Sequence, residues 1–394
     1  MNSNTLASID KGRSSNLGRL QYFVFITLII YFVVPHHLFT VFLNHSAVKP
    51  FDLTVLISIC FFLICKINLK GYLPILCLFG IYFLRSLIAS NEVGLISIVY
   101  ALKIFEYFIV IFCIKDLRQI FINKLLIIYI VTIFAYTLAE LFGLNVGLLW
   151  GDRATGHFGG PYELSAIALL FIFFLNKNLF LKTLFIFIIF LTGTKASYIA
   201  LLFGLLLFTN IRNLIPIIFI GFTFILLINS YDERFFEFII NLANIDINFV
   251  ISVWDNLPKI ESHYEYIDQF NTREMDSDET VDLSSFSRLF TYAIILKSFD
   301  IYSLIFGHGP GFFGAAVDSS ILRIVAEAGI VSLLPFIFIL ISLTNNFENK
   351  NKNVLLILSI IALSDVFFSA RFLPTLALLN QYKFYQLKEK AHIK

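Results

Sequence analysis

Long apolar runs separated by short polar connections make up most of the chain, and they set the first expectation about its fold. A helix needs about 20 mostly apolar residues to cross the hydrocarbon core of a bilayer. The runs predict an all-α polytopic membrane protein with about twelve transmembrane helices in a single integral membrane domain, residues 1–394. The predicted spans lie near residues 20–35, 51–66, 71–90, 94–114, 125–143, 162–176, 179–193, 196–210, 213–230, 321–343, 354–370 and 372–386.

The composition supports this reading, because 58% of the residues are hydrophobic and only 14% are charged. Ordinary soluble domains carry roughly a quarter charged residues. A chain this poor in charge cannot cover a water-facing surface, and disordered chains have the opposite balance. The formal net charge of +2 gives no reason to expect a nucleic acid partner.

The positions of lysine and arginine predict the orientation, since cytoplasmic connections are enriched in both. With the N-terminus in the cytoplasm, alternate connections collect most of these residues, and both termini are expected inside. The opposite connections then hold few. The inner group comprises Lys11, Arg13, Arg19, Lys66, Lys70, Lys115, Arg118, Lys124, Lys177, Lys182, Arg212, Lys350, Lys352, Lys383, Lys388, Lys390 and Lys394; the outer group comprises Lys49, Arg153, Lys195 and Arg371.

Two segments then face outward: a short loop over residues 145–162 and a long loop over residues 231–320, before the tenth span. The long loop holds roughly half of the 27 acidic residues and is the only stretch with a soluble composition. Loops of such length tend to be functional. Within it, residues 288–299 have the amphipathic pattern of a helix at the membrane interface.

The short outer loop is rich in glycine from Gly151 to Glu163 and contains Arg153 and His157. Glycines allow backbone N–H groups to approach an anion, and an arginine offers a bidentate fork for phosphate. Pro161 then begins a helix whose N-terminus also favours an anion. On these residues alone, a plain turn with a capping arginine stays an open alternative.

A second constellation closes the long loop, as Phe306-Gly-His-Gly-Pro-Gly-Phe-Phe-Gly followed by Asp318-Ser-Ser-Ile-Leu-Arg323. Its glycine spacing departs from a dinucleotide fingerprint, and no strand precedes it. We expect a loop that bends back toward the membrane and places His308 and Asp318 near the outer surface. The alternative for His308 is an ordinary interfacial residue.

Charged residues within the apolar runs are costly in a membrane and usually face a bundle interior. Arg85, Lys195 and Arg323 lie near the outer ends of their predicted helices, whereas Asp365 has no obvious partner in the sequence. This convergence of cations predicts an outward pocket for phosphate or diphosphate. The sequence has no P-loop and no zinc-protease or serine-hydrolase motif, and the acidic loop lacks a calcium-site spacing.

Two pairs of segments resemble the O-antigen polymerase and ligase superfamily. The first pair is Arg153-Ala-Thr-Gly-His-Phe-Gly-Gly-Pro-Tyr-Glu163 with Leu191-Thr-Gly-Thr-Lys-Ala-Ser197. The second pair is Leu304-Ile-Phe-Gly-His-Gly-Pro-Gly311 with Asp318-Ser-Ser-Ile-Leu-Arg-Ile-Val-Ala-Glu-Ala-Gly-Ile330. Their order and their predicted side of the membrane match the family together.

The resemblance implies a GT-C-like fold and a transferase of the bacterial inner membrane that works at the periplasmic face without nucleotide sugar or metal. Its donor would be an undecaprenyl-diphosphate-linked oligosaccharide. A polymerase transfers the growing glycan onto a new lipid-linked repeat unit, and a ligase transfers it to lipid A-core. Ligases commonly carry histidine where this chain has Asp318-Ser319, which favours a polymerase. A chain-length regulator protein is a further partner that the resemblance implies.

The resemblance also implies roles for single residues. Arg153 and Arg288 would hold the donor diphosphate, with Lys195 in support, and Asp318 would accept the proton of the acceptor hydroxyl, with His308 as the alternative base. The expected substrate-binding residues are His157, Glu163, Lys195, His308 and Arg323, while Arg323 and Glu327 would also order the pocket. The competing functions are the ligase, a lipid-linked glycan flippase or other transporter, and a non-enzymatic receptor or scaffold.

Overall fold

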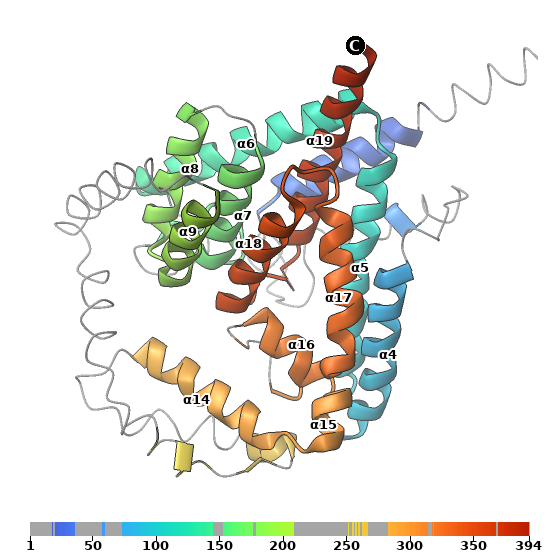
Figure 1. Cartoon of the computed structure of the whole chain (residues 1–394), viewed down its shortest axis with the longest axis vertical. Helices are drawn as coiled ribbons and strands as arrows, with labels where there is room; N and C mark the ends of the chain where they lie inside the picture. The colour runs from blue at the N-terminus through green and yellow to red at the C-terminus, as the bar shows by residue number, and fades with distance from the viewer. Residues whose placement is uncertain are drawn as a thin grey trace, which may run out of the picture.

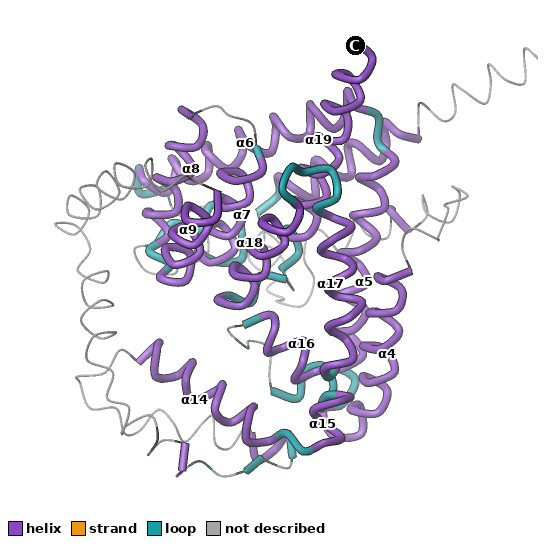
Figure 2. The backbone as a smooth tube through the Cα atoms, in the orientation of Figure 1, coloured by secondary structure: helices purple, strands orange, loops and turns teal. Residues whose placement is uncertain are grey.

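Helices and the loops between them make up the part of the chain that the computed structural model describes, and no strand occurs there (Figure 2). The all-α class predicted from the sequence is confirmed for these residues. The predicted spans 51–66, apart from three residues, and 213–230 lie outside them, as does most of the loop segment 231–282. The described residues are 18, 20–35, 57–59, 73–144, 153–175, 179–208, 251, 254–255, 257, 259–260, 262–266, 283–313, 317, 319–367 and 369–393.

Three helices are long and apolar enough to cross a bilayer, namely α4 (Leu73–Val93), α5 (Ile96–Asp116) and α6 (Gln119–Leu141). They coincide with the third, fourth and fifth predicted spans, and the chain is a helical membrane protein. The full count of twelve spans stays a prediction. Shorter apolar helices occupy Leu20–Val33, α7 (Pro161–Phe174), α8 (Leu179–Thr192), α9 (Lys195–Phe208) and the segment Ile330–Leu343.

The tenth predicted span, residues 321–343, is two helices rather than one. Helix α16 (Ser320–Ala328) ends at Gly329, and a short 3₁₀ turn leads into α17 (Leu333–Leu343). Gly329 has a φ of +74°, and a Cβ atom there would lie 2.0 Å from the carbonyl oxygen of Ile305. The expectation of one continuous helix is therefore wrong, because a left-handed glycine ends α16 where another segment packs against it.

The eleventh predicted span, residues 354–370, also differs. Helix α18 (Lys350–Leu363) ends before this span does, and residues 364–367 and 369–371 are non-helical on the way to α19 (Phe372–Ile393). The amphipathic helix predicted at 288–299 falls within α14 (Leu283–Ser298), which is followed by α15 (Ile301–Phe306). Both α14 and α15 lie at one end of the molecule, at the bottom of Figure 1.

The helices form two groups joined by α19. Helices α4, α5 and α17 run along one flank, whereas α7, α8 and α9 form the other group (Figure 1). Helix α19 contacts α5, α6 and α7, and α18 packs against α9 and α16. The connection between α18 and α19 therefore lies between the two groups.

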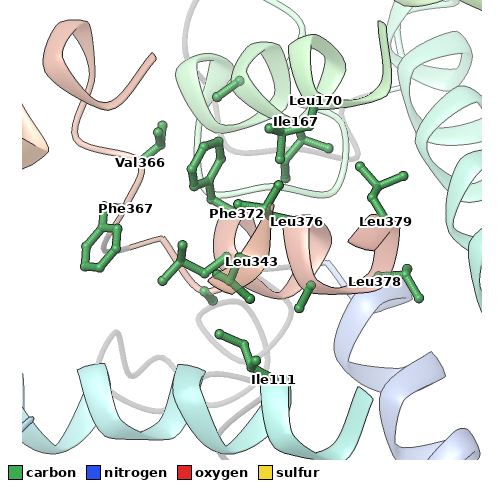
Figure 3. Packing of buried hydrophobic residues seen from close by; sticks show 14 of the residues in the cluster. Ile111, Ile167, Leu170, Leu343, Val366, Phe367, Phe372, Leu376, Leu378 and Leu379 are labelled. Carbon is green, nitrogen blue, oxygen red and sulfur yellow. The ribbon is translucent and has the colours of Figure 1, made fainter. Parts of the chain in front are cut away.

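Apolar packing around α19 joins the groups. Phe372 and Leu376 of α19 lie toward Ile167 and Leu170 of α7, and Ile111 of α5 approaches from the other side (Figure 3). All five side chains are buried. This core places the start of α19, and the connection before it, at a fixed position beside α7.

Hydrogen bonds between connections lie at the two ends of the bundle. The connections that meet at each end are those that the alternation of lysine and arginine in the sequence assigns to one side of the membrane. At one end, Gln21 and Gln381 donate to the carbonyls of Asp116 and Lys115, each at 3.2 Å, and Tyr385 donates to Leu117 at 2.7 Å. At the other end, the loop 153–160 contacts both the turn at Gly193 and the connection 364–371, as described below. Which end faces the cytoplasm stays a prediction.

Candidate functional site

The glycine-rich loop from Arg153 to Gly160 connects α6 to α7 and is folded into the protein. Thr155, His157 and Phe158 have no exposed surface. Gly156 has a φ of +58°, a conformation that favours glycine, and the Phe158 N–H donates to the Thr155 carbonyl at 3.2 Å. The backbone of the loop is tight and irregular, and most of it faces other parts of the protein.

The backbone N–H groups of this loop bind anions, and these anions are the carboxylates of the protein itself. Glu140 of α6 accepts hydrogen bonds from the N–H groups of Thr155 at 2.9 Å and Gly156 at 2.8 Å, and from the Thr155 hydroxyl at 2.7 Å. Glu163 accepts from the Gly159 N–H at 3.0 Å. Glu163 was predicted to bind substrate; its second carboxylate oxygen is buried with no hydrogen-bond partner among the described residues.

Arg371 holds the loop from its other side. Its guanidinium donates to the carbonyl of His157 at 2.7 Å, to that of Tyr31 at 3.2 Å, and to that of Val34. Its central carbon also lies 5.4 Å from the centre of the Phe158 ring. Arg371 is only 1% exposed. Its guanidinium contacts the loop and the end of the first helix.

His157, predicted to bind substrate, is instead a buried part of this frame. Its Nε2–H donates to the carbonyl of Phe32 at 2.7 Å. Burial and the nearby Arg371 hold the pKa of the His157 imidazole well below its usual value. The ring is therefore neutral at pH 7, with its proton on Nε2.

The two segments of the first sequence motif contact each other. The Ala154 N–H donates to the Leu191 carbonyl at 3.0 Å, which joins the loop to the turn that contains Gly193. Lys195 begins α9 directly after this turn, and both Arg153 and Lys195 are half-buried. The fold thus brings the segments that carry the two cations together, and their binding of a diphosphate stays a prediction.

The second glycine-rich segment caps the end of α16. The N–H groups of His308 and Gly309 donate to the carbonyls of Ala326 at 2.7 Å and Glu327 at 2.9 Å. Gly309 has a φ of +109°, and a Cβ atom there would lie 2.2 Å from that of Ala89 in α4. The glycines serve the close approach of three chain segments.

The side chain of His308 lies among aromatic rings. It stacks on Phe312 with ring centres 4.7 Å apart and on Phe299 at 5.9 Å. Its Nε2 is 3.4 Å from the hydroxyl of Ser298. Burial lowers the pKa of His308 to about 4, so the ring is neutral at pH 7.

Arg323 is shared by two carboxylates. Its Nε donates to Glu327 at 3.0 Å and its Nη1 donates to Asp365 at 2.8 Å, and both contacts are largely buried. The Ser320 hydroxyl also lies 3.3 Å from Asp365. Arg323 therefore orders the start of α16, and Asp365, which had no partner in the sequence, is the counter-charge that it binds.

The connection between α18 and α19 is the element that sequence reasoning missed. Asp365 contacts Arg323 beside the second motif, and Arg371, six positions later, contacts the loop of the first motif. Asp365 and Arg371 are charged residues at the end of an apolar run, and this pattern is the feature of the sequence that could have indicated a functional connection. The linear order of the chain did not reveal that one short segment touches both motifs.

The side chains of two predicted catalytic residues lie outside the part of the chain that the structure describes. Arg288 belongs to α14, but its side chain lies outside the described residues, and so does Asp318 as a whole. Within the described part of the chain, no group of three or more histidine, cysteine, aspartate or glutamate residues could hold a metal ion. No family model matches this chain, and neither a curated protein nor a solved structure matches it.

Proposed function

We propose that this protein is a glycosyltransferase of the bacterial inner membrane that polymerises undecaprenyl-diphosphate-linked oligosaccharide units at the periplasmic face, as O-antigen polymerases do. The observation that carries the proposal is the hydrogen bond between Ala154 and Leu191, which places the Arg153 loop beside the turn that leads to Lys195. A diphosphate needs two or more cations on one surface, and arginine is the side chain best suited to bind it.

In this proposal the acceptor hydroxyl of the new lipid-linked unit attacks the anomeric carbon of the growing glycan. The bond from that carbon to the diphosphate oxygen breaks, and undecaprenyl diphosphate leaves with the electron pair. Arg153, Lys195 and Arg288 stabilise the charge that develops on the leaving diphosphate. The proton of the acceptor hydroxyl passes to Asp318 as general base.

The environment of His308 supports this choice of base. Its pKa of about 4 makes its imidazole a weak base, and its ring is stacked between Phe299 and Phe312. A catalytic base works best when its pKa is near the operating pH and its nitrogen reaches the substrate. His308 is better explained as part of the packing of the outer segment.

A transporter is less well supported by the described helices. A flippase needs polar or charged groups along a path through the membrane. Beyond Glu163, Lys182 and Lys195, the described helices α7, α8 and α9 carry no charged residue, and Arg323 is paired with two carboxylates. These three charges lie in the first turn of their helices and not along a path through the membrane.

The test is the glycan ladder of a host strain that lacks the gene and carries plasmid variants. Arg153→Ala should reduce the ladder on a lipopolysaccharide gel to core plus one repeat unit, and Arg153→Lys should restore part of it. Arg118→Ala is the matched control, because Arg118 is exposed and lies at the opposite end, just before α6. Loss of all capped glycan, single units included, would instead assign the ligase reaction, and an unchanged ladder would exclude both.

A further inference from the structure

Arg371 is a buried arginine whose described partners are all on the backbone or on an aromatic face. Three carbonyls, of His157, Tyr31 and Val34, accept its hydrogen bonds, and the Phe158 ring lies against its guanidinium. A planar guanidinium can bind several acceptors at once, which a lysine ammonium on a flexible stem does less well. The residue is therefore suited to fixing the shape of a loop.

The loop that Arg371 fixes is the one that carries Arg153. His157 lies four positions after Arg153, and Glu140 binds the same stretch through the N–H groups of Thr155 and Gly156. Arg371 and Glu140 thus clamp the loop between them. Removal of one member should release a backbone that the other cannot hold alone.

The connection that carries Arg371 is itself anchored to the second motif. The Ser320 hydroxyl donates to the Ser364 carbonyl at 2.9 Å and accepts from the Phe367 N–H at 2.9 Å. Asp365 in the same connection binds Arg323. The position of Arg371 is consequently set by α16, which belongs to the second motif.

We propose that Arg371 is a positioning residue that holds the Arg153 loop in register with α16, and that the connection 364–371 aligns the donor-binding and acceptor-binding halves of the site. The assignment of these halves rests on the proposed function. The alignment of the loop with α16 does not rest on the proposed function, because it follows from the contacts of Arg371, Asp365 and Ser320. Arg371 acts on the reaction through Arg153 and makes no contact with substrate.

The first experiment measures the loop directly in the purified full-length protein in lipid nanodiscs. The four native cysteines are replaced by alanine, and Ala154→Cys supplies a reporter at a position that is 8% exposed. We expect Arg371→Gln to raise the rate of labelling by N-ethylmaleimide about tenfold, since charge-assisted hydrogen bonds of this kind are each worth about one order of magnitude. Arg371→Lys, which keeps the charge and most of the volume, should fold and still label faster than the parent.

Arg85→Gln is the matched control. Arg85 is also a buried arginine that binds a loop carbonyl, that of Gly307, but it holds the second glycine segment. Labelling at position 154 should stay at the parental rate in this variant. Parental labelling in both Arg371 variants, or an equal rise in Arg85→Gln, would overturn the positioning role.

The second experiment measures binding of undecaprenyl diphosphate to the same nanodiscs. Arg371→Gln and Arg153→Gln should each weaken binding about tenfold, and Arg371→Lys should recover part of the affinity. Binding that is weakened by Arg153→Gln but not by Arg371→Gln would overturn the link between the two residues. A parent protein that binds no undecaprenyl diphosphate would count against the proposed function, while the labelling rates would still decide whether Arg371 positions the loop.

Discussion

Asp365 accepts a 2.8 Å hydrogen bond from Arg323, although 42 positions separate them in the sequence. Glu327 shares the same guanidinium, so one buried cation serves two carboxylates. Substitution of the shared cation should therefore lower the stability of the protein more than substitution of one of the two carboxylates.

Arg323→Met should destabilise the protein far more than Asp365→Asn. The first change leaves two carboxylates without the cation that they share and should cost about 3–5 kcal/mol. The second leaves the Arg323–Glu327 pair intact and should cost about 1–3 kcal/mol. Thermal unfolding of the two variants in the same detergent measures the difference, and equal midpoints would contradict the shared arrangement.

Gly309→Ala should disrupt the packing of the second motif on α4. The new methyl group would lie 2.2 Å from the Cβ of Ala89, at a φ of +109°. Gly94 is the matched control, since it has a φ of +81° but nothing within 4 Å of an added Cβ. Gly94→Ala should cost only the backbone strain of about 1–2 kcal/mol, and Gly309→Ala roughly 1–3 kcal/mol more. Detergent-solubilised yield and unfolding midpoint would report it; similar losses in both variants would argue against the close contact.

Protonation of His308 should lower stability in acid. Its pKa is about 4 in the folded protein and about 6.5 in an unfolded chain. Between these values the unfolded state binds more protons, so the free energy of unfolding decreases as the pH falls from 6.5 to 4. Asp300, Arg85 and Lys259 are the charged groups that act on this ring.

His308→Phe removes the titrating group and keeps an aromatic ring between Phe299 and Phe312. The variant should therefore lose less thermal stability than the parent over this pH interval. Unfolding midpoints at a series of pH values give the comparison, and parallel curves for the two proteins would show that His308 does not titrate on unfolding.

Glu140→Gln should loosen the loop of the first motif. The carboxylate accepts three hydrogen bonds from Thr155 and Gly156, and an amide offers only one acceptor oxygen. Hydrogen exchange of a peptide that covers residues 153–160 should speed up by about tenfold or more. Glu92→Gln, at an exposed carboxylate, should leave this peptide unchanged; an effect of equal size there would mean that the charge, and not the contact, matters.

The orientation can be tested by fusions of alkaline phosphatase, which is active only outside the cytoplasm. Fusion after Ser298, at the end of α14, should give active enzyme, because the segment 231–320 is predicted to be periplasmic. Fusion after Lys352, near the start of α18, should be inactive, because that connection is rich in lysine. The reverse pattern would invert the proposed topology.

The long helices and the glycine turns could be predicted from the sequence because both are local properties. An apolar run of α4 or α5 has the length of a span wherever it packs. The break at Gly329 could not be predicted, because it depends on the approach of Ile305 from another segment. A glycine within an apolar run is compatible with either outcome.

The roles predicted for the site residues stay predictions, and the structure bears only on how the segments of the first motif lie. Arg153 and Lys195 were identified from motifs, and the structure brings their segments together. The sequence could not show that Glu140 and Glu163 bind the N–H groups of the loop, since a carboxylate near a glycine-rich stretch has no fixed partner until the chain folds. The role of Arg371 depends on contacts with residues more than 200 positions away.

The contacts of Arg371 with the first helix also have a consequence for how the protein is made. Tyr31 and Val34 are bound by a side chain that lies 340 and 337 positions later. During synthesis the first helix enters the membrane long before Arg371 is made. The carbonyls at the end of this helix can accept their hydrogen bonds from Arg371 only after the ribosome has translated residue 371. The loop that carries Arg153 can acquire its final shape only as one of the last steps of biogenesis, so a chain truncated before residue 371 should insert its earlier helices and yet never assemble this site.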